Sequence, residues 1–192
     1  DCINYGNFNI EIGNHVSGTT YIGCVNGRCA SAAEAVGNGL FGCKNYGNLT
    51  INIIDSNTSK NFYIGGVTGS SNSYTVTSAC ENYGNVTFNT PNSAALVCLA
   101  GVTPYSAGNI SDCINEGNVT FNSTGQIKGT AVAGIAAYEN GTITNCINKG
   151  AIYMTGKMFG GRNTLGSIST SAATSSAAPT VAGIVGYGYS SS

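Results

Sequence analysis

The chain has 192 residues, of which only 8% are charged, and its formal net charge is −1. So few Lys and Arg residues exclude the clustered basic surface that nucleic-acid binding requires. No apolar run approaches the ~18 residues of a transmembrane helix, so no membrane span is predicted. The length fits one domain over residues 1–192. Eight cysteines favour an oxidising compartment, and the predicted location is extracellular or at the cell surface.

In chain order, the first feature is a five-residue motif, Cys-x-Asn-x-Gly, that recurs along the whole chain. The motif occupies residues 2–6, 43–47, 80–84, 113–117 and 146–150. It divides the chain into repeats at about 1–40, 41–77, 78–110, 111–143 and 144–192. An internal period of this size is typical of solenoids and other repeat architectures.

Three short strands are predicted in each repeat. The first alternates polar and apolar residues, as in 85–89 and 118–122. The second is apolar with small residues, as in 63–67, 132–135 and 181–185, and a third at 141–145 precedes the next cysteine. One such unit cannot bury its apolar face, but units stacked ~4.8 Å apart close a continuous core. The sequence therefore predicts an all-β fold, a parallel β-helix or solenoid of about five three-strand coils.

Strand alternation places the motif cysteine and the apolar residues of the first strand inside each coil. The motif asparagine is expected at a turn, where stacked amides hydrogen-bond from coil to coil as in a steric zipper. The motif glycine is expected to take a positive φ at the corner. Two insertions, 25–39 and 156–180, are expected as long surface loops in the first and last coils. Only 31–36 has the composition of a short helix.

The combined pattern resembles a known family. Cys-x-Asn-x-Gly-x-Val, followed by Ala-Gly-Ile-x-Gly-Tyr, is similar to the GLUG-type repeats of bacterial and protist surface proteins. The Cys/Asn/Gly column covers all five repeats, and a Gly-Ile/Val column follows at Val67, Val102, Ile135 and Ile184. The resemblance implies an extracellular adhesin-like or matrix role, and it brings no catalytic residues with it.

The position between the motif Asn and Gly points outward in this register. Up the stack it holds Tyr5, Tyr46, Tyr83, Glu116 and Lys149. The three tyrosines form a predicted strip, which either stabilises the sheet by cross-strand stacking or serves as a sugar-binding platform or subunit contact. The opposite charges of Glu116 and Lys149 in neighbouring coils support the register. Lys44 and Glu81 form a second such pair one position earlier.

The five motif cysteines form one column. A buried ladder of mostly reduced thiols is expected, because side chains on parallel neighbours point the same way. Cys24 and Cys29 flank a short loop and are the candidate disulfide. No metal site or other cofactor is predicted, since the chain has one histidine, His15, and no pair of Cys-x-x-Cys motifs.

N-glycosylation sequons, Asn-x-Ser/Thr, are the other candidate sites. They begin at Asn48, Asn57, Asn85, Asn109, Asn118, Asn122 and Asn140. Asn48, Asn85 and Asn118 fall in one column, so either a ridge of glycans or an unmodified asparagine ladder is expected along it.

Function is predicted to be structural rather than catalytic. The carboxylates are scattered and no nucleophile or nucleotide-binding motif is present, so the chain is predicted not to be an enzyme. Asp1-Cys2 begins in the phase of Asp112-Cys113, which predicts either a section of a longer repeat protein with flanking repeats or subunits stacked head to tail. The favoured hypothesis is an extracellular fibre subunit with a candidate glycan coat. The alternative is an adhesin module that binds glycans through the tyrosine strip.

Overall fold

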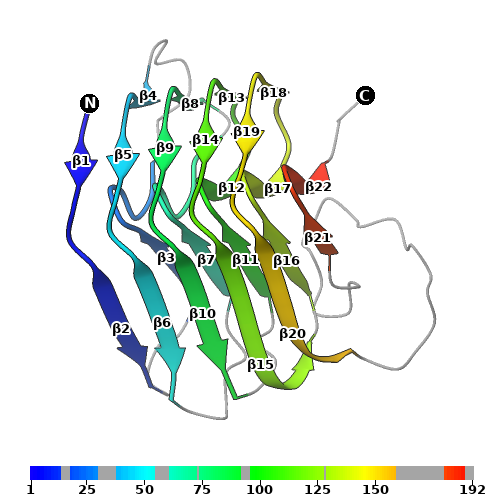
Figure 1. The fold of residues 1–192 in the computed structure, drawn as a ribbon. Coiled ribbons are helices and arrows are strands. Elements are labelled where there is room, and N and C mark those ends of the chain that lie inside the picture. The colour runs from blue at the N-terminus through cyan, green and yellow to red at the C-terminus, as the bar shows by residue number, and fades with distance from the viewer. Residues whose placement is uncertain are drawn as a thin grey trace.

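The described part of the chain is all β, and its strands pair in parallel from one coil to the next. The computed structural model describes residues 1–13, 18–29, 38–54, 61–72, 74–91, 96–127, 129–158 and 180–188. The strands stack along one axis into five sheets, with β1 and β19 at opposite ends (Figure 1). This arrangement confirms the predicted parallel β-solenoid. The segment 31–36 and most of the two expected loops lie outside the described residues.

We number the sheets in the order in which a coil meets them. Sheet 1 contains β1 (Ile3–Asn4), β5 (Lys44–Asn45), β9 (Glu81–Asn82), β14 (Ile114–Asn115) and β19 (Ile147–Asn148). Sheet 2 contains β2 (Phe8–Ile12), β6 (Leu49–Ile53), β10 (Val86–Thr90), β15 (Val119–Ile127) and β20 (Ile152–Met158). Sheet 3 contains β3 (Thr19–Gly23), β7 (Asn61–Gly65), β11 (Leu96–Ala100), β16 (Thr130–Ala133) and β21 (Thr180–Ala182). Sheet 4 contains β12 (Thr103–Ser106), β17 (Ala136–Glu139) and β22 (Val185–Gly188), and sheet 5 contains β4 (Gly39–Phe41), β8 (Val76–Ser78), β13 (Ile110–Ser111) and β18 (Ile143–Thr144).

The coils are divided more finely than the three strands predicted. The two motif residues that follow the cysteine, such as Glu81 and Asn82, pair with the equivalent residues of the neighbouring coils. These pairings form sheet 1. The Gly-Ile/Val column bends the chain between sheets 3 and 4. A Cβ on Gly101 would lie 2.2 Å from the side chain of Asn115, so only glycine allows this corner to touch the motif asparagine of the next coil. The two columns that define the repeat are therefore in direct contact.

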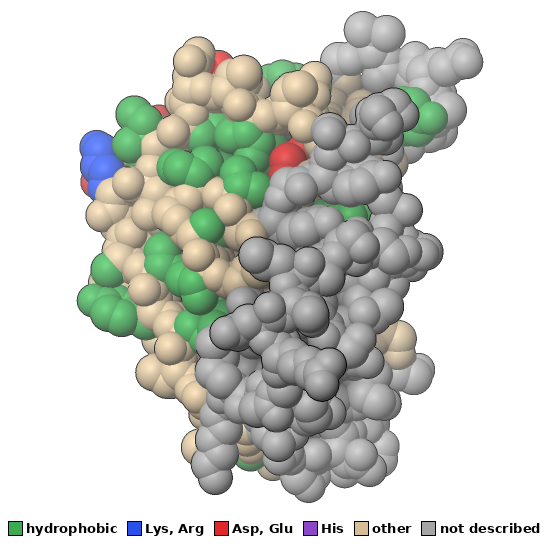
Figure 2. Space-filling model, turned by 90° about the vertical axis from the view of Figure 1, so that its right-hand side faces the viewer, with side chains coloured by type: hydrophobic (Ala, Val, Ile, Leu, Met, Phe, Trp, Pro, Cys, Tyr) green, Lys and Arg blue, Asp and Glu red, His purple; other side chains and the backbone are tan. Residues whose placement is uncertain are grey.

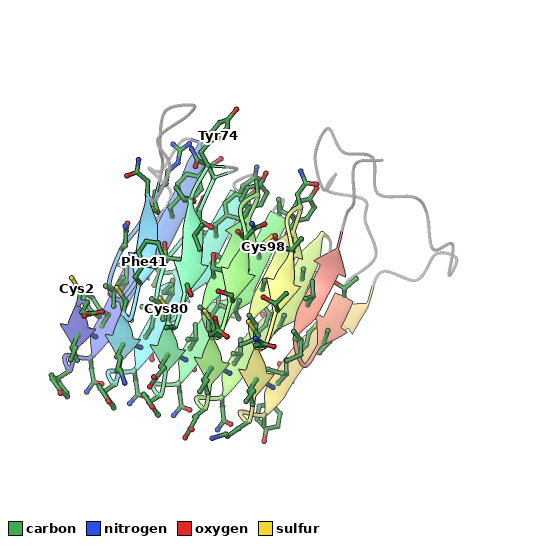
Figure 3. The ribbon with its side chains drawn as sticks, turned by 90° about the horizontal axis from the view of Figure 1, so that it is seen from above. Cys2, Phe41, Tyr74, Cys80 and Cys98 are labelled. Atoms are coloured by element: carbon green, nitrogen blue, oxygen red, sulfur yellow. The ribbon has the colours of Figure 1, made fainter. Side chains whose placement is uncertain are left out.

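The described residues form two large apolar cores and a third, minor cluster that includes Leu96 and Cys98. The larger lies between sheets 2 and 3, where Leu49, Val86 and Val119 from the first predicted strand are completely buried. The smaller packs the motif cysteines against the Gly-Ile/Val column, for example Cys80 against Val67 and Val102. In Figure 3, Cys80 lies inside the stack whereas Cys2 lies at its end. The predicted inward orientation of the cysteine column is confirmed for Cys43, Cys80 and Cys113.

The motif asparagines form the predicted amide ladder inside the molecule. The Nδ2 group of Asn45 donates to Oδ1 of Asn82 at 2.8 Å, and Asn82 donates in the same way to Asn115 at 2.7 Å. Each Nδ2 also donates to the carbonyl of the motif glycine, as from Asn82 to Gly84 at 2.8 Å. The asparagine ends a strand of sheet 1, and its side chain closes the turn that follows. The side chains of the interior asparagines are fully buried with hydrogen-bond partners, as buried polar groups must be.

The predicted positive φ of the motif glycine is wrong. The left-handed residues instead directly precede the motif cysteine: Gly42, Ala79, Asp112 and Asn145, with φ between 52° and 61°. Glycine is required in the motif for a different reason. A Cβ on Gly84 would lie 1.9 Å from the carbonyl oxygen of Gly47, so the coils could not approach to sheet spacing with any side chain there.

Candidate functional site

The predicted tyrosine strip exists on the outside of sheet 1. The rings of Tyr5 and Tyr46 stack with centroids 5.0 Å apart, and those of Tyr46 and Tyr83 stack at 4.7 Å with an interplanar angle of 1°. Since the stack runs along the solenoid axis, each ring turns its faces toward its neighbours and its edge toward solvent. A sugar platform needs an open ring face, and both faces of the Tyr46 ring are covered by its neighbours. The geometry therefore matches cross-strand stabilisation more closely than sugar binding.

Charged groups complete this surface in the predicted register. Nζ of Lys44 lies 3.0 Å from Oε1 of Glu81, and Nζ of Lys149 lies 2.7 Å from Oε1 of Glu116. Tyr83 donates a short hydrogen bond to Glu81. That bond, together with Lys44, holds the pKa of Glu81 below its usual range, and the same bond raises the pKa of Tyr83 to about 12. These pairs are partly exposed and screened by solvent, so each contributes little to stability.

The sequon column is exposed and forms a second asparagine ladder. Oδ1 of Asn48 accepts the backbone N–H of Asn85 at 2.9 Å, and Oδ1 of Asn85 accepts that of Asn118 at 2.9 Å. The ladder uses the side-chain oxygens, and the Nδ2 groups to which glycans attach are not part of it. This ladder therefore leaves the Nδ2 groups out of its bonds, and glycosylation of the column stays a prediction.

The remaining sequons occupy other settings. Asn109 is exposed and accepts the hydroxyl of Thr142 at 2.9 Å, and Asn140 is exposed beside Gly141. Asn122 lies on the outer face of sheet 2, where its Nδ2 donates to Asn89 at 2.9 Å. Asn57 lies outside the described residues, as does His15.

All eight cysteines are described, and all are free thiols. In the motif column, Sγ of Cys113 donates to the carbonyl of Ser111 at 3.2 Å. Its contact with Cys146 lowers the pKa of Cys146 to about 7, and Cys146 is half-buried at the end of the column. Among the described residues, no group of three or more His, Cys, Asp or Glu side chains is arranged to hold a metal ion.

The candidate disulfide residues Cys24 and Cys29 differ in setting. Cys24 is buried in the larger core, where burial raises its pKa to about 12, whereas Cys29 is half-buried against the smaller core. Both are free thiols in the structure, with no bond between them. Their oxidation to a disulfide stays a prediction.

One buried acid was not singled out by the sequence. Glu139 is only 4% exposed, at the end of β17. Its Oε1 accepts the backbone N–H of Gly141 at 2.5 Å, but its Oε2 has no partner. Burial raises the pKa of Glu139 to about 8. Register pairs it with Ser106 and, one coil earlier, with Ser71, so a carboxyl group replaces the hydroxyls of this column.

At the two ends of the stack, the edge strands have no partner strand on one side among the described residues. Phe8 is 40% exposed in β2, although its column neighbours Leu49, Val86 and Val119 are completely buried. In the fifth coil, Val181 is likewise exposed at the end of its column. Figure 2 looks onto this end and shows hydrophobic side chains across its described part. Among the described residues, several apolar columns therefore run through the stack and end in exposed or half-buried side chains in the first and fifth coils.

Comparison with known proteins found no matching family model, no similar curated protein and no similar solved structure. The resemblance to GLUG-type repeats therefore stays a prediction, and the repeat residues are its only support. No helix in the described ranges is long and apolar enough to cross a membrane.

Proposed function

We propose that the chain is a structural unit of an extracellular scaffold, in which copies stack head to tail into a fibre. The observation that carries the proposal is the pair of matching edges at the first and fifth coils, whose strands have no further partner strand among the described residues. Open sheet edges attract further strands. A contact between two unlike faces does not close on itself, so repeated contacts build a fibre.

Hydrogen-bond polarity makes the two edges complementary. In sheet 1 the N–H groups of a coil donate to carbonyls of the coil before it, as from Lys44 to Cys2 at 2.8 Å. By the same pattern the N–H of Ile3 points away from the second coil. In a head-to-tail contact it would meet the carbonyl of Cys146 in the preceding copy. At this position of sheet 1 the first coil thus offers a donor and the fifth coil an acceptor. In sheet 2, where the N–H of Phe8 donates to the carbonyl of Asn48 at 2.8 Å, the roles of the two coils are reversed.

The apolar columns are complementary as well. In sheet 1, Ile3 and Ile147 are the apolar ends of a column that holds Lys44 and Glu81 between them, and they are 54% and 49% exposed. In sheet 3, Ile22 and Val181 end a column whose interior members are completely buried. A contact in coil register would cover each of these side chains with another apolar one, and burial of apolar area is favourable.

The test compares two substitutions at Ile3. Proline removes the N–H that points away from the second coil, and proline is tolerated on edge strands when that N–H faces solvent. Threonine keeps the N–H and the strand preference. Electron microscopy and sedimentation over a concentration series should give filaments for wild type and Ile3→Thr, and monomers for Ile3→Pro. The expected axial repeat is ~24 Å, from five coils at ~4.8 Å.

Two results would contradict the proposal. Wild-type particles that stay monodisperse at every concentration would remove self-stacking and leave flanking repeats as the only cover for the edges. Filaments of Ile3→Pro with an unchanged repeat would mean that other contacts drive assembly. A monomeric state in Ile3→Pro with an unchanged melting temperature is the supporting outcome, because it separates assembly from folding.

The extracellular location and the glycan coat belong to the same proposal. They are supported by the low charge, the cysteine content and the exposed sequon column. The adhesin alternative, with the tyrosine strip as its binding site, draws no support from rings that cover one another's faces.

A further inference from the structure

The outer face of sheet 2 carries a regular array of uncharged polar side chains. In coils two, three and four the outward positions read Asn-x-Thr-x-Asn, as in Asn85, Thr87 and Asn89. Register places each position directly above its equivalent, so Thr87 pairs with Thr50 and Thr120. The array therefore forms three columns parallel to the solenoid axis.

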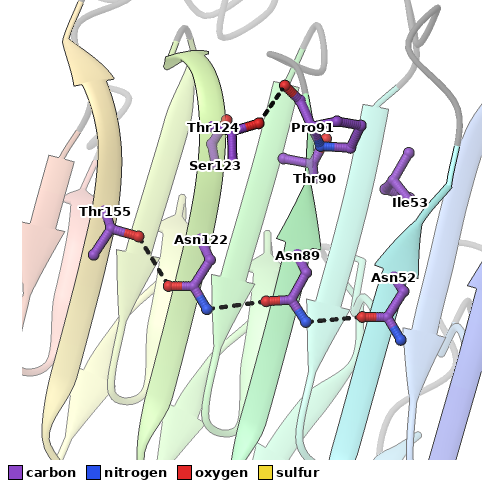
Figure 4. Close-up of a pocket in the computed structure, with 9 residues that line it drawn as sticks. All are labelled: Asn52, Ile53, Asn89, Thr90, Pro91, Asn122, Ser123, Thr124 and Thr155. Carbon is purple, nitrogen blue, oxygen red and sulfur yellow. Dashed lines mark hydrogen bonds between the residues drawn. The ribbon is translucent and has the colours of Figure 1, made fainter.

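A groove follows the third of these columns. It has a volume of about 440 Å³ and is lined by residues from four successive coils. Asn52, Asn89, Asn122 and Thr155 form one wall, and Figure 4 shows their hydrogen bonds in a single row. Ile53, Thr90 and Pro91 contribute to the other side. None of the nine lining residues is charged.

The amides of this row keep half of their hydrogen-bonding capacity free. Nδ2 of Asn89 donates to Oδ1 of Asn52 at 2.8 Å, and Nδ2 of Asn122 donates to Oδ1 of Asn89 at 2.9 Å. An amide has two N–H donors and two acceptor lone pairs. In the row, Asn89 uses one donor and one lone pair, so one of each stays open to the groove. The second, third and fourth coils repeat this amide at a spacing of ~4.8 Å.

We propose that this groove binds an extended, neutral, β-linked polysaccharide that runs along the solenoid axis with one sugar unit per coil. Sugar hydroxyls donate and accept at once, which matches the open donor and acceptor of each amide. The coil spacing is close to the length of one pyranose residue in an extended β-linked chain. Pro91, which is exposed, supplies apolar contact for the C–H surface of the sugar ring.

The same residues exclude other ligands. A polyanion such as a polyuronate has no counter-charge in the groove, because no Lys or Arg lines it. A flat crystalline surface cannot follow a hollowed row. A glycan attached to Asn122 would fill the groove, so binding requires that this sequon be unoccupied. The groove lies on a lateral sheet, and its occupation is independent of head-to-tail assembly.

The test is titration calorimetry of unglycosylated protein with hexasaccharides of β-1,4-linked glucose, xylose and N-acetylglucosamine. Saturable binding to at least one of them is expected, with polygalacturonate hexamer as the non-binding control. Asn89→Thr should weaken binding about tenfold, the equivalent of ~1.4 kcal/mol. Threonine already occupies this position in the fifth coil, at Thr155, so the substitution suits the fold. Thr124→Trp should abolish binding by filling the groove from an exposed position.

Tyr46→Ser is the matched control on the tyrosine strip outside the groove and should leave affinity unchanged. The proposal is overturned if none of the three neutral hexasaccharides binds, or if the polyuronate binds equally well. It is also overturned if Asn89→Thr and Thr124→Trp both bind as wild type does, or if only Tyr46→Ser loses binding, which would assign recognition to the tyrosine strip.

Discussion

Glu139 makes the stability of the fold depend on pH. Its pKa is raised to about 8 by burial, against ~4.3 in an unfolded chain. Between these values the folded protein holds a proton that the unfolded chain has lost. The contribution of Glu139 to stability is therefore complete below about pH 4 and is lost as the pH rises through about 8. The expected loss is about 1.4 kcal/mol for each pH unit in this window.

The substitution Glu139→Gln tests this reasoning. The amide keeps the acceptor for the N–H of Gly141 but does not ionise. Urea denaturation of both proteins between pH 5.5 and 8.5 should show the wild type losing about 3 kcal/mol relative to the variant. Cys146 also interacts electrostatically with Glu139, and comparing the variant with wild type at each pH removes most of its separate contribution.

Glu11→Gln is the matched control, because it removes the same charge from an exposed position in β2. It should follow the wild-type curve. If the curves of Glu139→Gln and wild type are parallel across the range, Glu139 is ionised in the folded protein and the argument from burial fails.

Three further predictions concern the ladder and the corners. Asn82→Ala leaves a donor of Asn45 and an acceptor of Asn115 unpaired, and should lower the free energy of unfolding by about 3 kcal/mol in urea denaturation; no change would mean that water replaces the amide. Gly84→Ala places a Cβ against the Gly47 carbonyl and should lower the free energy of unfolding by more than ~4 kcal/mol. A normal melting temperature would contradict the close-approach argument. Ala79→Gly relieves a φ of 52° and should raise stability by up to about 1 kcal/mol, whereas a loss would mean that the alanine methyl group contributes packing.

The repeat made much of the fold predictable because stacking converts a sequence column into a line of contacts. Once the motif cysteines are aligned, Glu116 must lie beside Lys149 and Tyr46 beside its two neighbours, and both pairings are confirmed. The asparagine ladder follows from the same register. In a solenoid each coil touches only its neighbours, so no long-range topology had to be guessed.

The corners were not predictable because a glycine has two unrelated uses. It permits a positive φ, and it permits close approach of another backbone. Only the position of the Gly47 carbonyl decides between them for Gly84. The left-handed residues were missed for the complementary reason: Ala79 is a residue type that rarely adopts such a φ, and only the coil geometry imposes it.

Glu139 and the groove were missed because they depend on segments of unequal length. The repeats differ in their loops, so the column that joins Ser71, Ser106 and Glu139 appears only when strands are superposed in space. The groove is lined, where sheet 2 ends, by residues from both the inward and the outward positions of its strands. Alternation alone marks Thr90 as interior and Asn89 as exterior, and it does not indicate that both line one surface.

The sequon column shows why the two expectations for it are not exclusive. The ladder of Asn48, Asn85 and Asn118 uses their Oδ1 atoms, and a glycan would attach to Nδ2. In a host that N-glycosylates, we expect these three sites to be occupied while the ladder persists, with no loss of thermal stability. Peptide mapping before and after glycosidase treatment measures the occupancy. A bare-chain mass would reject the glycan ridge, and a glycan on Asn122 would reject a functional groove in that host, because the two compete for one space.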